Sequence, residues 1–208
     1  MVANYGQLKT SLATLLNRDD LTSNIPDFIR MLEQTVNREV KFRNRRMETT
    51  ASLAIANGNE ITIPADYIET RALVYLSTPR VKLDYMTPSA FENTYTTDSP
   101  SQPVSYTITG NLIKIGPHPS LAVNCNLTYM QKLTALTSDA DTNWLLDNHA
   151  DAYLYGAAVH SAPFLGDDNR LQTWFGLYDR VASEIAGDDS RARWNGAPVR
   201  PQLSITVV

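Results

Sequence analysis

Apolar residues recur at helical spacing near both ends of the chain. Behind Asn4, a good N-cap residue, leucines at every third or fourth position predict an amphipathic helix over residues 5–17. A second helix is predicted from Asn24, with Pro26 in its first turn. Its apolar face comprises Phe28, Ile29, Leu32, Val36 and Val40.

The C-terminal third of the chain predicts two further helices. The first, over residues 148–162, is rich in alanine, and small residues permit close backbone approach. The second, over residues 167–186, begins behind two acidic residues. Its core or interface stripe comprises Leu171, Trp174, Phe175, Tyr178, Val181 and Ile185.

Between residues 49 and 131 the pattern changes to alternation with a period of two, which predicts strands. We expect a hairpin over residues 53–63 around Asn57-Gly58-Asn59, and another over residues 104–115 around Gly110-Asn111. Single strands are expected over residues 81–85 and 121–129. Two short helices are expected in the same region, from Tyr67 to Ser77 and from Pro88 to Tyr95.

The fold class that these elements predict is α+β, mainly α. A helical bundle drawn from both chain ends, residues 1–48 and 137–190, carries a β-hairpin-rich insertion over residues 49–136, and together they form a single domain over residues 1–190. Residues 191–208 are predicted to form an extended C-terminal tail. Its end alternates apolar and polar residues, which is typical of a strand added to the sheet edge of another protein.

Composition is that of an ordinary folded protein. Of the 208 residues, 43% are hydrophobic and 19% charged, and the formal net charge of -4 gives no global attraction to DNA or to an acidic membrane. No apolar run approaches the ~18 residues that a membrane span needs. The start of the chain lacks a basic stretch followed by an apolar one. We therefore expect a soluble protein made in the cytoplasm, without a membrane partner.

The sequence contains no phosphate-binding glycine loop, no nucleophile elbow and no cysteine pair for zinc. The single cysteine, Cys125, is expected to be a core thiol. His149 and His160 fall about 16 Å apart on one helix and cannot share a metal. Pairs of carboxylates such as Glu33 with Glu39 occur, but nothing in the sequence sets one apart as a buried acid.

A short acidic stretch, Asp139, Asp141 and Asn143, begins like a calcium-binding loop. Trp144 stands where that loop requires glycine, and Ala150 where it requires glutamate. The stretch is therefore interpreted as a helix-initiating loop. The sequence predicts no catalytic residue, no metal and no cofactor, so the protein is not expected to be an enzyme.

A basic cluster crowds the second helix and its exit. It comprises Arg30, Arg38, Lys41, Arg43, Arg45 and Arg46. One interpretation is a solvated face paired with acidic neighbours; the other is an electrostatic contact with a neighbouring subunit or with DNA. Phe42 is the one aromatic residue within the cluster, so stacking on bases is not indicated.

An ordered series of short motifs runs through most of the chain. The motifs are Ile63 to Glu69 (IPADYIE), Gln102-Pro103, Tyr106 to Ile113 (YTITGNLI), Ile115-Gly116-Pro117, Leu127 to Met130 (LTYM), Leu133 to Leu136, Thr142 to Leu146 (TNWLL), Asp151 to Gly156 (DAYLYG) and Asp167-Asp168 with Trp174. In this order, from about Gln7 to Gly187, the chain resembles the head-to-tail adaptor (connector) family of short-tailed bacteriophages.

The resemblance implies a non-enzymatic virion protein of the head–tail junction. Twelve copies would form a ring beneath the portal protein, extend the channel through which DNA passes, and dock the tail nozzle or other tail proteins. The family fold is a helical bundle with a β-rich insertion, and its C-terminal segment reaches the portal. The residues on which this role falls here are Arg191, Arg193, Trp194, Arg200, Leu203, Ile205 and Val207.

Two other functions remain open. The first is a DNA-binding accessory protein that uses the basic cluster, with non-specific contacts to duplex DNA. The second is a different virion ring, such as a stopper or a tail terminator. The motif order through Asn143-Trp144 favours the adaptor over these rings.

Overall fold

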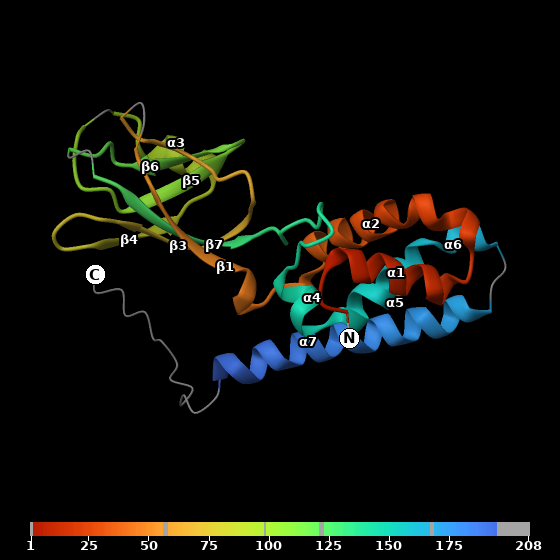
Figure 1. The fold of residues 1–208 in the computed structure, drawn as a ribbon. Helices are drawn as coiled ribbons and strands as arrows, with labels where there is room; N and C mark the ends of the chain where they lie inside the picture. Colours follow the sequence, from red (N-terminus) through yellow and green to blue (C-terminus); the bar gives the residue numbers. More distant parts are fainter. Residues whose placement is uncertain (1, 56–57, 98, 121–122, 167–168, 195–208) are drawn as a thin grey trace. The chain divides into compact units, whose positions relative to one another are not determined.

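The structure is a computed structural model that describes residues 2–55, 58–97, 99–120, 123–166 and 169–194, with side chains as far as Asp189. The chain divides into two compact units (Figure 1). The helical unit is formed by Met1–Arg45 and Ala135–Val208, and the β-rich unit by Arg46–Thr134. The protein is therefore of mixed α+β class.

The helical unit draws its helices from both ends of the chain. They are α1 (Tyr5–Leu16), η1 (Asp19–Asn24), α2 (Ile25–Arg38), η2 (Val40–Phe42), α4 (Trp144–Asn148), α5 (Ala150–His160), α6 (Ala162–Leu165) and α7 (Arg170–Trp194), and η3 (Arg45–Met47) leads into the other unit. The predicted cap of α1 is confirmed, because the Asn4 side chain accepts a hydrogen bond from the Gln7 amide at 2.9 Å.

Helix α5 lies at the centre of the helical unit, packed against α1, α2 and α7. Figure 1 shows α2 and α7 on opposite sides of it. Small residues make this possible: a Cβ added at Gly156 would lie 2.5 Å from Leu32 Cδ1 and 2.9 Å from Tyr178 Cε2. The glycine therefore lets side chains of α2 and α7 approach the α5 backbone from both sides.

In the part of the chain that the structure describes, the β-rich unit is one curled sheet of seven strands. Its elements are β1 (Glu48–Leu53), β2 (Glu60–Thr62), β3 (Tyr67–Tyr75), β4 (Val81–Tyr85), α3 (Pro88–Thr94), β5 (Ser105–Thr109), β6 (Leu112–Gly116) and β7 (Cys125–Gln131). The strand order is β1-β7-β3-β4-β5-β6-β2, with β4 and β5 parallel and the other pairs antiparallel. Inward side chains from β2 to β7 share one core, which includes Ile61, Leu73, Leu83, Tyr106, Ile113 and Leu127.

The helix predicted from Tyr67 to Ser77 is wrong, because this segment forms strand β3. Its register with β7 shifts twice, between Tyr67 and Glu69 and between Thr70 and Ala72. Such bulges interrupt the alternation of inward and outward residues, which hides the strand pattern in the sequence. Pairing with β7 on one side and β4 on the other then decides the conformation.

The hairpin predicted over residues 53–63 is also wrong. Strand β1 pairs with β7, and β2 pairs with β6, so the two strands lie at opposite ends of the sheet order. The second predicted hairpin is confirmed: β5 and β6 are antiparallel, and Gly110 adopts a positive φ of 60° at their turn. The short helix after Thr87 is confirmed as α3.

Helix α7 continues to Trp194, so residues 191–194 are helical and do not belong to an extended tail. Gly187 costs the helix only about 1 kcal/mol relative to alanine, and no proline follows before Pro198. Arg191, Arg193 and Trp194 thus lie on the last turns of α7. The remaining residues of the predicted portal contact, Arg200, Leu203, Ile205 and Val207, lie outside the described residues.

Candidate interaction site

The basic cluster begins on the exposed face of α2. The Arg30 guanidinium lies 3.9 Å from the Asp27 carboxylate, one helical turn earlier, and both side chains are exposed. Arg38 donates through Nε to the Gln34 carbonyl at 3.2 Å. Exposed polar interactions such as these contribute little to the free energy of unfolding, so the stability of the fold does not depend on Arg30 or Arg38.

Two residues near the end of the basic cluster, Lys41 and Arg45, contact acidic residues of α7. Lys41 forms an ion pair with Asp179, and the hydrogen bond to that carboxylate raises the pKa of Lys41. The Arg45 amide donates to Asp189 Oδ1 at 2.8 Å. Acidic residues of α7 therefore offset part of the positive charge of the cluster. This agrees with the interpretation of the cluster as a solvated face paired with acidic neighbours.

The other two members of the cluster are not free surface charges. Arg43 donates through Nη2 to the Asn37 carbonyl at 2.9 Å, and its Nη1 is buried with no hydrogen-bond partner among the described residues. Arg46 belongs to the β-rich unit and interacts with another group. The six basic residues therefore do not act as one uniform patch.

Two residues that the sequence assigned to apolar faces are exposed. Val40 is 81% exposed because α2 ends at Arg38 and the following 3-10 turn rotates Val40 out of the helix face. Phe175 is 58% exposed, since it lies about 100° around α7 from the buried Trp174. Met31 of α2 is also half-exposed.

A buried polar network joins α2 to the C-terminal part of the helical unit. Glu33, only 5% exposed, accepts hydrogen bonds through Oε1 from the Leu136 amide and the Tyr153 hydroxyl, both at 3.0 Å. Asn143 donates to the same hydroxyl at 2.7 Å and also caps α4, accepting from the Leu146 amide at 3.0 Å. All of these hydrogen bonds are buried, so the role of the network is to fix the packing of the helical unit.

Burial raises the pKa of Glu33, and the hydrogen bonds from Leu136 and Tyr153 oppose that rise. The sequence pattern singles out no carboxylate as a buried acid, and that interpretation is wrong for Glu33. Glu33 stands among Ile29, Leu32 and Val36 on the apolar side of α2. A charged residue at a position of the apolar stripe was the available signal.

The acidic stretch from Asp139 to Asn143 holds the start of α1. The Asp141 carboxylate accepts hydrogen bonds from the Thr137 amide at 2.9 Å and the Ser138 amide at 2.7 Å. The carbonyls of Asp139 and Asp141 accept from the amides of Gly6 and Tyr5, each at 3.0 Å. Within the described residues, no group of three His, Cys, Asp or Glu side chains is arranged to hold a metal ion.

The remaining reactive side chains lie in packed surroundings. His160 lies with Nε2 3.3 Å from Thr35 Oγ1, and burial lowers its pKa. Cys125 is fully buried in the sheet core, and burial raises the pKa of its thiol to about 12. None of the helices in the described part of the chain has the length and apolar character needed to cross a membrane.

The family model described as SU10 adaptor protein matches residues 3–202, which span the β-rich unit and nearly all of the helical unit. A search of curated proteins finds no match.

Proposed function

The chain belongs to the SU10 adaptor protein family, and from this membership we propose that it is a structural protein of the phage particle that connects the head to the tail. In the proposed arrangement, twelve copies form a ring beneath the portal, extend its DNA channel, and present a surface to which the tail nozzle or other tail proteins attach. The observation that carries the proposal is the extent of the family match, residues 3–202.

The chemistry of the described residues supports a structural role. Glu33, the most deeply buried acid of α2, is engaged by a main-chain amide and a phenol. Asp141 closes a turn, and its pKa is lowered by hydrogen bonds from Ser138 and Thr137. These groups position segments of the chain against one another, and no catalytic step is proposed for them.

Portal docking is assigned to the C-terminal segment. It comprises Arg191, Arg193 and Trp194 at the end of α7, followed by Arg200, Leu203, Ile205 and Val207. An extended chain spans at most about 3.3–3.6 Å per residue, so a stretch as long as residues 195–208 can span at most roughly 45–50 Å. The alternation of Leu203, Ile205 and Val207 suits a strand that pairs with an exposed sheet edge of the portal.

Native mass spectrometry of the protein, alone and mixed with the portal oligomer of the same phage, tests this function. We expect monomers alone and a stable complex of about one adaptor per portal subunit in the mixture, because weak single contacts add up around a ring. Deleting residues 195–208 is expected to abolish the complex. A matched control removes only Val208, which leaves Leu203, Ile205 and Val207 in place.

Two outcomes contradict the proposal. If the full chain ignores the portal but binds duplex DNA in a salt-sensitive manner, and loses that binding when Arg43, Arg45 and Arg46 are changed to Ala, the protein is a DNA-binding accessory protein. If it binds neither the portal nor DNA but assembles with tail proteins alone, it is a stopper or tail terminator.

A further inference from the structure

We infer that neighbouring copies contact each other head to tail through two different helix faces of the helical unit, an inference that rests on the proposed ring. The first surface, the α2 face, comprises the exposed residues Asp27, Arg30, Met31, Gln34 and Arg38. The second, the α7 face, comprises the exposed residues Gln172, Phe175, Gly176, Arg180, Ser183, Glu184 and Asp188. The α2 face of one copy packs on the α7 face of the next.

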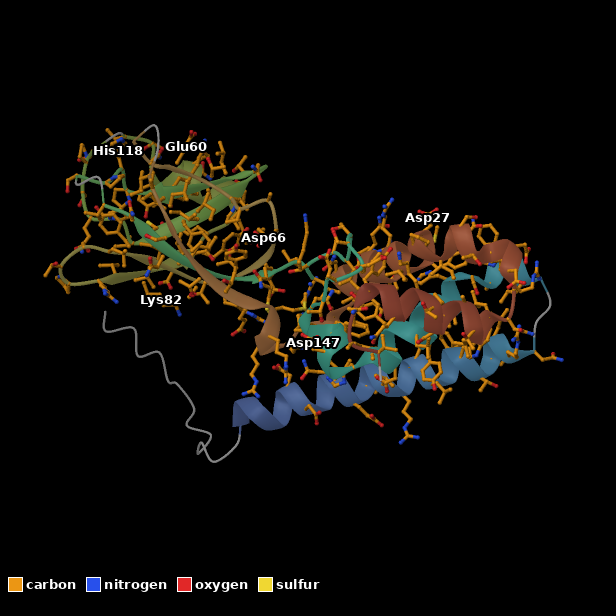
Figure 2. The ribbon with its side chains drawn as sticks, in the orientation of Figure 1. Asp27, Glu60, Asp66, Lys82, His118 and Asp147 are labelled. Carbon is orange, nitrogen blue, oxygen red and sulfur yellow. The ribbon has the colours of Figure 1, made fainter. Side chains whose placement is uncertain are left out.

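The placement of these faces suits a ring. A closed ring of more than two copies requires two distinct surfaces on each subunit that are complementary to each other. Helices α2 and α7 both bury their apolar sides toward α5 and lie on opposite sides of it (Figure 1). Their exposed sides therefore point in opposite directions, and Figure 2 shows Asp27 on the side of α2 that faces away from α5.

The two faces are complementary in size. The α2 face consists of long side chains around Met31, which is 45% exposed. The α7 face carries Gly176, where an added Cβ would meet no atom within 4 Å, and Ser183 two turns later. Phe175 lies next to Gly176 and is 58% exposed, so it provides an apolar surface for Met31 of the neighbouring copy.

The faces are also complementary in charge. On the α2 face the basic residues Arg30 and Arg38 outnumber the acidic Asp27, and on the α7 face the acidic residues Glu184 and Asp188 outnumber the basic Arg180. Contact between an α2 face and an α7 face is therefore attractive, while contact between two copies of the same face brings like charges together. This charge pattern favours a second copy of the chain as the partner, bound head to tail so that the α2 face of one copy meets the α7 face of the other.

A charge-exchange experiment tests the contact. One variant carries Arg30→Glu and Arg38→Glu on α2; the other carries Glu184→Arg and Asp188→Arg on α7. Each variant alone is expected to need about tenfold more protein to saturate the portal, because every contact in its ring pairs like charges. An equimolar mixture is expected to return to within about twofold of the unaltered chain, since alternating copies restore opposite charges at every contact.

Cysteine cross-linking on the portal gives a second readout. Copies with Met31→Cys mixed with copies with Gly176→Cys are expected to form disulfide-linked dimers, which neither population forms alone. The native Cys125 is fully buried and does not interfere. Thr14→Cys, on the exposed side of α1, is the matched control that should not cross-link to Gly176→Cys.

The outcomes separate this inference from the proposed function. If the unaltered chain saturates the portal, but both charge variants assemble equally well and Met31→Cys fails to cross-link with Gly176→Cys, the helix-face contact is wrong and the adaptor function stands. If the unaltered chain does not bind the portal at all, no ring is formed and both proposals fall. Rescue by mixing, together with the cross-link, supports both.

Discussion

The phenol of Tyr153 donates a hydrogen bond to the carboxylate of Glu33 across the interior of the helical unit, at 3.0 Å. The two residues come from opposite halves of the chain, on α5 and α2. Because the same carboxylate oxygen also accepts from the Leu136 amide, one buried acceptor fixes α2 against both α5 and the segment that precedes α4. The first two predictions depend on this acceptor.

Replacing Glu33 with Ala is expected to lower the free energy of unfolding by about 2–4 kcal/mol, because two buried donors, the Leu136 amide and the Tyr153 hydroxyl, lose their acceptor. Glu33→Gln keeps a side-chain oxygen at the same place and is the matched control, expected to be close to the unaltered protein. Urea unfolding followed by circular dichroism measures both variants. Equal stability of Glu33→Ala and the unaltered chain would contradict the network.

The raised pKa of Glu33 makes part of the stability depend on pH. The folded protein holds this proton more tightly than the unfolded chain, whose carboxyl has a pKa near 4.5. The contribution is therefore complete below that value and is lost as the pH rises through the folded pKa. The stability of Glu33→Gln relative to the unaltered protein should increase between pH 4 and pH 8. A difference that is constant over this range would be the opposing result.

Gly156→Ala is expected to destabilise the helical unit by about 1–3 kcal/mol, because the new Cβ overlaps Leu32 and Tyr178. Gly176→Ala, also within a helix but with open space around the new Cβ, is expected to stabilise the protein by about 0.5–1 kcal/mol. Thermal unfolding of the two variants separates the effect of packing from that of helix propensity. Similar shifts in Tm for both would show that α5 is not closely packed at Gly156.

Cys125 is expected to resist thiol reagents in the folded protein, because it is buried and its pKa is raised to about 12. At pH 8 a chromogenic disulfide reagent should leave the native thiol almost unmodified and titrate it fully in urea. The Gly176→Cys variant supplies an exposed thiol as the positive control in the same assay. Rapid reaction of Cys125 in the native protein would mean that the sheet core opens readily.

Much of the helical unit could be predicted from the sequence because its signals are local. Asn4 marks the start of α1, and apolar spacing marks α2 and α7. Strand pairing is not local: Thr50 of β1 lies opposite Thr128 of β7, so no turn signal announces it. Residue Asn57 beside Gly58 instead suggested a hairpin between strands that pair elsewhere.

The site residues show the same limit. The burial of Glu33 depends on Tyr153 and Leu136, whose approach depends on the whole fold. The exposure of Val40 follows from the helix ending two residues earlier, and helix ends are less clearly encoded than helix faces. The basic cluster could be found from the sequence, but the ion pair of Lys41 with Asp179 could not, because its partners lie on helices from opposite ends of the chain.

The central position of α5 sets an order for the folding of the newly made chain. Helices α1 and α2 leave the ribosome long before α5, the helix on which both of them pack. The β-rich unit is one continuous stretch, Arg46–Thr134, and all its strands are synthesised before α5 appears. The β-rich unit can therefore fold while α1 and α2 still expose their apolar faces. Chaperones that bind such faces would act on this protein during that interval.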